Sequence, residues 1–440
     1  MSIRDEILVM PWYDTHCHIG CLHNAGLYDE HAFLCDCVRG LELPEMDLPA
    51  VLEGSYMKWL FCSVRVNPDS LAHAAGFPDS LTWAREDPAA WWNANRPHYR
   101  RMETTGTVRT LVRGIRELHG IDLGFGEDEP FIEHNKRVRE NYRREGFYSI
   151  WKKAFQRLNC VRAVKLVEMP WFDRPVANEE AWRAEQDLVV PALRVDSFTA
   201  LHLPDERLSF RLRPELLGID APSLDDYLAQ VDRCLDRAVA GGIRALKNAY
   251  AYFGPLRFAE PDPVSADRYV RRGNPEDYRA FEGAVLTHLM EWANQRGFPY
   301  QMHAGIVRIP WCDPTQLADY FDRYYGIRFV PLHIHPYERE AGCMAAWRGN
   351  VHLDPCWMGI MSPEVLRNAF REWIGIVPPE KIFCGIDTTT PEQWFGAAVM
   401  AKESLAAVLE EKIEQGLLDP DQALRTAKSI LFDTASQWYE

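Results

Sequence analysis

The chain has 440 residues, of which 47% are hydrophobic and 26% are charged, and its formal net charge is −15 at pH 7. This excess of carboxylates argues against nucleic acid as a partner, because binding to phosphates relies on clustered Lys and Arg. No apolar run is long enough to span a bilayer, and the first residues lack the basic and apolar regions of a signal peptide. We therefore expect a cytoplasmic globular protein without a membrane partner.

Strand-like segments alternate with helical ones along most of the chain, which is the pattern of a parallel sheet. The predicted strands are residues 10–18, 161–167, 193–197, 243–247, 299–303, 328–333, 350–354 and 381–387. Apolar residues at helical spacing predict helices over 224–240, 278–295 and 363–373, and a closing amphipathic helix over 421–439. Eight strands with helices between them predict an α/β fold, a (β/α)8 TIM barrel.

A long segment, residues 21–155, does not fit a minimal barrel because it separates the first and second strands. Helical patterns at 48–60, 107–118 and 129–145 predict a helical insertion within a single domain, 1–440. The insertion follows the first strand directly, so it would emerge on the catalytic face as a lid or a wall of the substrate pocket. The alternative is a helical appendage for contacts between subunits, and we expect a homo-oligomer.

Two histidines one residue apart end the first predicted strand, in the run Tyr13-Asp14-Thr15-His16-Cys17-His18. Alternate residues of a strand point to the same side, so His16 and His18 place two imidazoles side by side, as a divalent metal requires. Further polar residues end later strands, on the face where barrels of this kind carry their chemistry. They are Lys247, His303, His333 and Asp387.

The order of these motifs resembles the amidohydrolase superfamily of metal-dependent barrels. Segments 245–252, 332–341 and 351–354 are similar to the amidohydrolase part of FluG-type proteins, and the opening run 13–18 also resembles uronate isomerases. The resemblance implies that His16, His18, His303 and Asp387 hold a divalent metal, zinc first and manganese second. One or two ions remain open at this point.

The resemblance also assigns roles to the other residues of that face. Asp387 would carry a proton, and His333 would either hold a second metal or polarise the substrate. Lys247 would either be carboxylated and bridge two metals or bind a substrate carboxylate. Residues that follow the fourth to seventh strands are candidates for substrate binding. Tyr250, Tyr252, Tyr337 and Arg339 could bind substrate oxygens or a carboxylate, and Trp311 and Trp357 could form an apolar wall.

The expected reaction is hydrolysis, in which a metal-bound hydroxide attacks an amide-type or ester bond of a small-molecule substrate. Two other reactions of such barrels are alternatives: non-oxidative decarboxylation of an aromatic or unsaturated acid, and a proton transfer like that of uronate isomerases. A non-catalytic metal-binding scaffold is a further alternative from a different class. The sequence does not identify the substrate.

Overall fold

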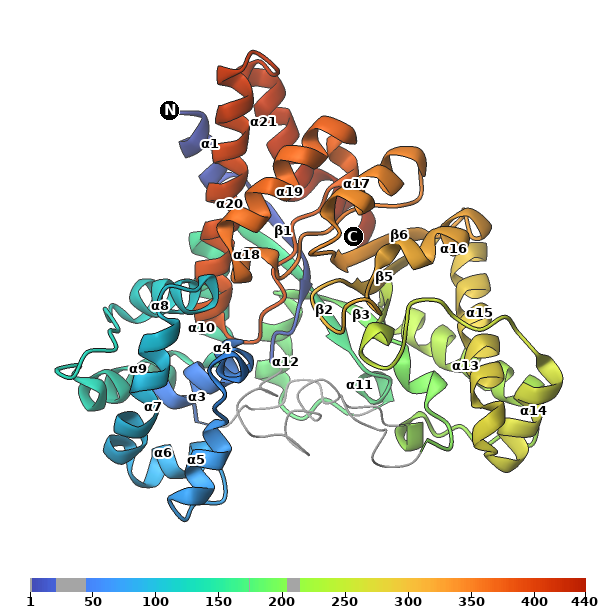
Figure 1. Cartoon of the computed structure of the whole chain (residues 1–440), viewed down its shortest axis with the longest axis horizontal. Coiled ribbons are helices and arrows are strands. Elements are labelled where there is room, and N and C mark those ends of the chain that lie inside the picture. The colour runs from blue at the N-terminus through green and yellow to red at the C-terminus, as the bar shows by residue number, and fades with distance from the viewer. Residues whose placement is uncertain (1, 21–44, 174, 204–213) are drawn as a thin grey trace.

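A computed structural model describes residues 2–20, 45–173, 175–203 and 214–440. Its centre is a parallel sheet whose strand order follows the chain, which confirms the α/β class (Figure 1). The strands are β1 (Trp12–Cys17), β2 (Cys160–Val167), β3 (Val189–Arg194), β4 (Ala245–Asn248), β5 (Pro299–Ala304) and β6 (Arg328–His333). Most of their residues are buried, as expected for a parallel sheet covered on both faces.

The last two predicted strands are present only as isolated bridges. Residues 350–354 pair with β6 at Val351 and Asp354, and Leu353 pairs with Ile382. The chain then reaches β1, since the Asp387 amide donates to the His16 carbonyl over 2.8 Å. The six regular strands are thus confirmed, while a closed barrel of eight regular strands is not.

Two buried carboxylates explain why the eighth predicted strand is irregular. Asp354 accepts hydrogen bonds from the backbone amides of Gly385 (2.9 Å) and Cys356 (3.0 Å). Asp14 accepts one from the Ile386 amide over 2.9 Å. These amides therefore bond to side chains where a regular ladder would use the carbonyls of a neighbouring strand.

The third strand lies four residues earlier than its predicted start. We expected residues 193–197, but β3 covers Val189–Arg194 and a 3-10 helix, η3 (Asp196–Thr199), follows it. Pro191 lies inside β3, where a missing N–H usually argues against a strand. Here its carbonyl still accepts from the Arg244 amide over 3.0 Å, so the sheet tolerates the proline.

Only helices lie between β1 and β2 in the described residues 45–157. Figure 1 shows them gathered at one side of the sheet, and residues 21–44 of the predicted insertion lie outside the described residues. They are α3 (Leu48–Gly54), α4 (Met57–Leu60), η2 (Phe61–Val64), α5 (Pro68–Ala74), α6 (Ser80–Glu86), α7 (Pro88–Met102), α8 (Gly106–His119), α9 (Phe131–Glu145) and α10 (Phe147–Arg157). Whether this helical segment serves as a lid or as a subunit contact stays a prediction.

The other helices surround the sheet, as the alternating pattern predicts. They are α1 (Ile3–Val9), α11 (Pro170–Asp173), α12 (Glu179–Gln186), α13 (Leu224–Ala240), α14 (Pro263–Arg272), α15 (Tyr278–Arg296), α16 (Ala318–Arg323), α17 (Glu338–Trp347), α18 (Met358–Met361), α19 (Pro363–Ile376), α20 (Pro391–Glu414), α21 (Pro420–Lys428) and α22 (Thr434–Tyr439). The predicted closing helix is split, because a π-helical segment, Ser429–Asp433, separates α21 from α22. None of the helices in the described ranges is long and apolar enough to cross a membrane.

The helical segment after β1 is joined to the rest of the fold where α8 crosses α20. A Cβ at Gly114 of α8 would lie 1.7 Å from the Glu392 carbonyl oxygen, and one at Gly396 of α20 would lie 1.8 Å from that of Thr110. Only glycine allows two helix backbones to approach this closely. Since α20 begins just after Asp387, the crossing also anchors the segment beside the predicted metal site.

Candidate metal centre

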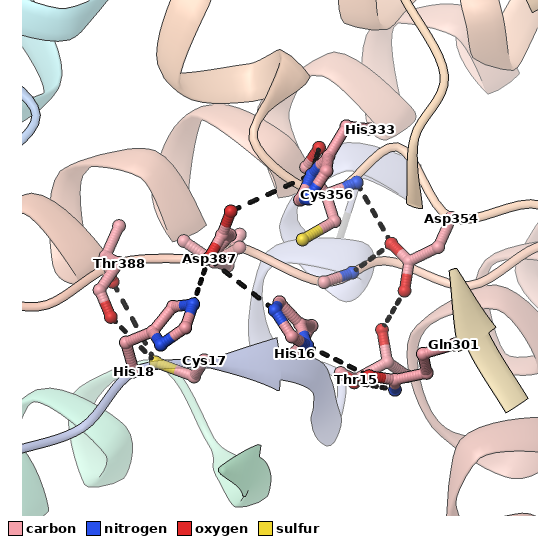
Figure 2. Close-up of polar contacts among 12 residues, drawn as sticks. Thr15, His16, Cys17, His18, Gln301, His333, Asp354, Cys356, Asp387 and Thr388 are labelled. Atoms are coloured by element: carbon pink, nitrogen blue, oxygen red, sulfur yellow. Dashed lines mark hydrogen bonds and ion pairs between the residues drawn. The ribbon is translucent and has the colours of Figure 1, made fainter. Parts of the chain in front are cut away.

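Three predicted ligands converge where β1 meets the last irregular segment. His16 of β1 and His18, the residue after its end, point toward Asp387 (Figure 2). The Nε2 atoms of His18 and His16 lie 3.1 Å and 3.7 Å from Asp387 Oδ1. The three side chains each offer a ligand atom, all within 4.8 Å of one another, so the structure brings these predicted ligands together.

The protonation of these groups suits a metal. Burial holds the pKa of His16 and of His303 well below the ordinary value, so both imidazoles are neutral. Burial alone would raise the pKa of Asp387, but a hydrogen bond from His18 and the nearby histidines hold it well below its usual range. The centre therefore offers neutral nitrogen and anionic oxygen atoms, which zinc and manganese both accept.

Two ligand atoms at the centre lack any partner of their own. Nε2 of His16 and Nε2 of His303 are buried and have no hydrogen-bond partner among the residues that the structure describes. A buried polar atom without a partner is costly, and a bound cation would remove that cost. The residues present therefore fit a divalent metal.

Gln301 of β5 fixes the orientation and the tautomer of His16. Its amide nitrogen donates to the Thr15 carbonyl (2.8 Å) and to the Tyr439 hydroxyl (3.1 Å), so its Oε1 is the atom left to face His16 Nδ1, at 2.9 Å. An amide oxygen only accepts, so Nδ1 carries the proton and Nε2 keeps its lone pair for the cavity.

His333 lies opposite the β1 histidines and has its tautomer fixed in the same way. Its Nδ1 is 3.1 Å from the Cys356 carbonyl, which requires the proton on Nδ1 and leaves Nε2 as an acceptor. His333, Cys356 and Asp387 form a second group of ligand atoms within 4.8 Å, which shares Asp387 with the first. His303 belongs to neither group, although its ring centroid is 4.3 Å from that of His333.

The backbone is strained at three residues of this centre. Asp387, His333 and Trp357 all have φ between 64° and 73°, the left-handed region that side chains with a Cβ rarely adopt. Ile334, a β-branched residue, follows with φ 52°. Such strain persists only where the surroundings enforce it, and it is concentrated at functional sites.

A cavity of about 80 Å³ opens at this centre, on the face where the strands end. Its wall includes the predicted residues Lys247, Tyr252 and Trp357 together with the histidines and Asp387. Burial lowers the pKa of Lys247 to about 8, against the opposing influence of Asp196 and Asp387. Lys247 thus faces the same cavity as the metal ligands, as the motif order predicts.

Two of the predicted substrate residues lie elsewhere. The side chain of Arg339 is 76% exposed and pairs with Glu372 over 2.7 Å. Tyr337 precedes α17 and is outside the cavity wall, because the chain turns away from the site there through a hydrogen bond from its amide to the Ile334 carbonyl. The structure therefore separates both residues from the metal centre.

Arg194 is a cavity residue that the sequence analysis did not single out. It ends β3, is buried, and pairs with Asp196 over 2.8 Å and with Glu168 over 3.5 Å. The signal was available, since a charged residue ends a run of apolar ones. Because the strand was placed four residues too late, Arg194 was assigned to its beginning.

Tyr56 was also missed, and nothing in its local sequence indicated a role. It lies between α3 and α4, stacks on Trp357 with ring centroids 4.7 Å apart, and lines the cavity. Burial, the charge of Asp387 and a hydrogen bond to that carboxylate hold the pKa of the Tyr56 hydroxyl well above its usual value. The helical segment after β1 thus supplies part of the site wall.

Comparisons with known proteins agree with the predicted resemblance. No protein-family model matches the chain. A segment of 152 residues, 32% of this chain, is 31% identical to the protein fluG of Emericella nidulans, of which it spans 17%. The predicted similarity to FluG-type proteins is therefore confirmed for part of the chain.

Solved structures extend the likeness to the whole fold. The uronate isomerase of Thermotoga maritima aligns with a TM-score of 0.73 and 13% identity, covering 100% of this chain and 96% of its own. The glucuronate isomerase of Caulobacter crescentus aligns with a TM-score of 0.71 and 14% identity, over 99% and 92% of the two chains. A protein from Lactobacillus casei described as a metal-dependent hydrolase aligns with a TM-score of 0.65 and 15% identity, covering 99% of this chain and 97% of its own. The chain therefore has the fold of these proteins.

Proposed function

We propose that this chain is a metal-dependent enzyme of the amidohydrolase superfamily that hydrolyses an amide-type or ester bond of a small organic acid. The observation that carries the proposal is the convergence of His16, His18 and Asp387 beside buried imidazole nitrogens without partners. The likeness to fluG and to the metal-dependent hydrolase fold supports it.

The residues of the centre would have different roles in hydrolysis. A divalent metal held by His16, His18 and Asp387 lowers the pKa of water and polarises a carbonyl when it is bound. Asp387 is ionised, so its carboxylate can accept a proton and return it to the leaving group. His333 presents an acceptor nitrogen to the cavity, which favours the role of a ligand or base over that of a donor to the substrate.

The cations of the cavity support an acidic substrate. Arg194 and Lys247 are partners across β3 and β4, and both face the cavity. Arg194 has two carboxylate partners, whereas no carboxylate of the described residues lies within 4.0 Å of Lys247 Nζ. A substrate carboxylate beside these two side chains would balance the remaining positive charge.

Isomerisation of a uronate is the second candidate function. It is favoured by the alignment of the whole chain, including the helical segment that supplies Tyr56, with two uronate isomerase structures. A uronate also carries the carboxylate that Arg194 and Lys247 would bind. The two candidates differ in their products, so one set of assays separates them.

The test is a substrate screen with protein loaded with zinc or with manganese. The panel contains N-acyl amino acids, γ-glutamyl amides, lactones, aromatic acids and uronates, with product analysis for hydrolysis, loss of CO2 and ketose formation. Hydrolysis of a panel member by the wild type is expected, with kcat about 10²–10⁴ lower in Asp387→Asn because a positioned proton carrier is lost. A metal-loaded Asp387→Asn protein with normal turnover would contradict the proposal, and ketose formation alone would replace hydrolysis by isomerisation.

A further inference from the structure

A second cavity, of about 600 Å³, lies beside the metal cavity on the same face. The segments that follow β3, β4 and β5 enclose it together with the start of α15. Tyr252 lines both cavities, and its ring centroid is 4.5 Å from that of His303. Tyr252 is the residue common to the two walls, so a molecule that extends from the metal centre into the second cavity has to pass its side chain.

The wall of this second cavity is largely aromatic and carries two arginines, Arg308 and Arg279, of which Arg279 pairs with Glu282 of the same wall over 2.5 Å. Tyr250, Tyr252, Tyr278 and Trp311 line it, and Trp311 is 38% exposed although tryptophan is costly to leave in water. The guanidinium of Arg308 lies 5.3 Å from the centre of the Trp311 ring. No carboxylate of the described chain pairs with Arg308, so this cation is available to a ligand.

The Arg308–Trp311 loop is held in place by its backbone. Residues in this loop and just before it are strained, with φ 65° at Ile306 and 43° at Arg308, and hydrogen bonds to neighbouring loops hold this segment. The Ile306 amide donates to the His335 carbonyl over 2.6 Å, and the Trp311 carbonyl accepts from the Leu256 amide over 3.1 Å. The backbone therefore holds the aromatic residue of this loop in a defined position on this face.

We propose that the second cavity binds an aryl group at the far end of an elongated acidic substrate, while the reacting end lies in the metal cavity. The substrate class is then an N-aroyl amino acid, with its carboxylate near Lys247 and Arg194 and its ring against Trp311. Arg308 favours a ring that bears an anionic substituent. The assignment rests on the proposed function only in placing the reacting bond at the metal.

The test compares two amino acids that have no amide to hydrolyse, N-benzylglycine and N-methylglycine. Calorimetric titration of zinc-loaded protein should show that N-benzylglycine binds about 10-fold tighter, because its phenyl group is buried. Trp311→Ala should remove this preference and leave the affinity for N-methylglycine unchanged. Trp347→Ala is the matched control, since Trp347 is 88% exposed at the end of α17, before residues 350–354, and should change neither affinity.

A second pair of variants tests the cation. N-(4-carboxybenzyl)glycine should bind tighter than N-benzylglycine to the wild type, and Arg308→Gln should abolish that gain. Arg339→Gln, which removes an exposed arginine paired with Glu372, should retain it. Metal content and circular dichroism confirm that each variant is loaded and folded, and Tyr278→Leu replaces Trp311→Ala if the latter does not fold.

Equal affinities of the two glycines for the wild type, or an unchanged preference in Trp311→Ala, would overturn the aryl site. Failure of the hydrolase proposal has a different signature. An aryl preference that Trp311→Ala removes, in a protein that hydrolyses no member of the panel, would support the second cavity and refute the reaction.

Discussion

Gln301 is the residue that determines which nitrogen of His16 faces the metal cavity. Its amide nitrogen is fully used by Thr15 and Tyr439, so its oxygen must accept the His16 Nδ1 proton. Partners of this kind set both the ring orientation and the basicity of a metal ligand. No local motif marks Gln301, because its role depends on β5 and α22 meeting beside β1.

Replacing Gln301 by leucine should therefore weaken metal binding about 10–100-fold without unfolding the protein. The loss follows from a His16 ring that no longer has an acceptor for its Nδ1 proton. Competition with a metal chelator of known affinity measures the change. Gln301→Glu keeps an acceptor oxygen and should recover part of the affinity, and Gln415→Leu, at an exposed position after α20, is the control. Wild-type affinity in Gln301→Leu would show that the contact is only structural.

Lys247 distinguishes a site with one metal from one with two. If Lys247 binds a substrate carboxylate, Lys247→Met should raise KM about 10–100-fold, because a buried charge-assisted contact of roughly 1.5–3 kcal/mol is lost, and leave metal content unchanged. If it is carboxylated and bridges two ions, the same change should remove one equivalent of metal. Elemental analysis beside steady-state kinetics separates the two results. Arg194 lies next to Lys247, and no carboxylate in the described part of the chain pairs with Lys247, so we expect the first result.

The order of the strand-end residues was enough to predict most of the candidate site. His16 and His18 follow from the two-residue repeat of a strand, and Lys247, His303, His333 and Asp387 from the ends of later ones. Arg194 was not predicted as a site residue, because Pro191 argued against a strand at the true position of β3. Tyr56 and Cys356 reach the site through tertiary packing alone, which no local pattern encodes.

Helix α3 carries a buried carboxylate whose ionisation should make this element sensitive to pH. Burial raises the pKa of Glu53 from its ordinary value of 4.5 to about 7, although Lys58 lies 3.9 Å away and Ser80 donates to it. The folded chain thus keeps a proton that the unfolded chain releases. Its contribution to stability is complete below pH 4.5 and is lost as the pH rises through 7.

Between these limits the cost of ionising Glu53 amounts to about 3 kcal/mol. Glu53→Gln cannot ionise, so its Tm relative to the wild type should rise from pH 5 to pH 8. Thermal unfolding followed by circular dichroism at both pH values measures the trend. Glu86→Gln, at an exposed position of α6, should show none. A difference in Tm that is the same at both pH values would refute the assignment to Glu53.

The crossing of α8 and α20 should tolerate no added methyl group. In Gly396→Ala the new Cβ meets the Thr110 carbonyl oxygen, a backbone atom that cannot rotate away. We expect a loss of about 1–3 kcal/mol or more in unfolding free energy. Gly375→Ala in α19 is the matched control, since its Cβ meets only the flexible Lys412 Nζ at 3.9 Å and alanine favours a helix by about 0.5–1 kcal/mol. An unchanged Tm in Gly396→Ala would mean that the two helices can move apart at little cost.

Helices and strands were predicted correctly where the apolar residues of a segment followed a single helical or strand spacing. Helix α13 coincides with residues 224–240, and β6 with residues 328–333. It failed for residues 381–387, because Asp14 and Asp354 bond to backbone amides that a regular strand would pair with its neighbours. The close α8–α20 crossing is a contact between distant residues, and periodicity does not encode such contacts.

At the scale of the whole molecule, the metal ligands join the first strand to the last irregular segment. His16 belongs to β1 and His18 directly follows it, whereas Asp387 follows residues that contact their neighbours through isolated bridges and a few hydrogen bonds. A cation bound to all three side chains would link β1 to the irregular segment that contains Asp387. Metal binding and the stability of the fold should therefore be coupled.

We expect Tm to rise with the concentration of free zinc or manganese, because an ion that binds only the folded state stabilises it by about 2.7 kcal/mol at 100 times its Kd. Removing the metal with a chelator should lower Tm but leave the circular dichroism at 25 °C unchanged, since the large buried core does not depend on the ion. His16→Ala should abolish the rise. His288→Ala, which removes an ion pair with Asp232 between α15 and α13, should preserve it. A Tm that is independent of metal in the wild type, with no metal detected by elemental analysis, would refute the metal centre itself.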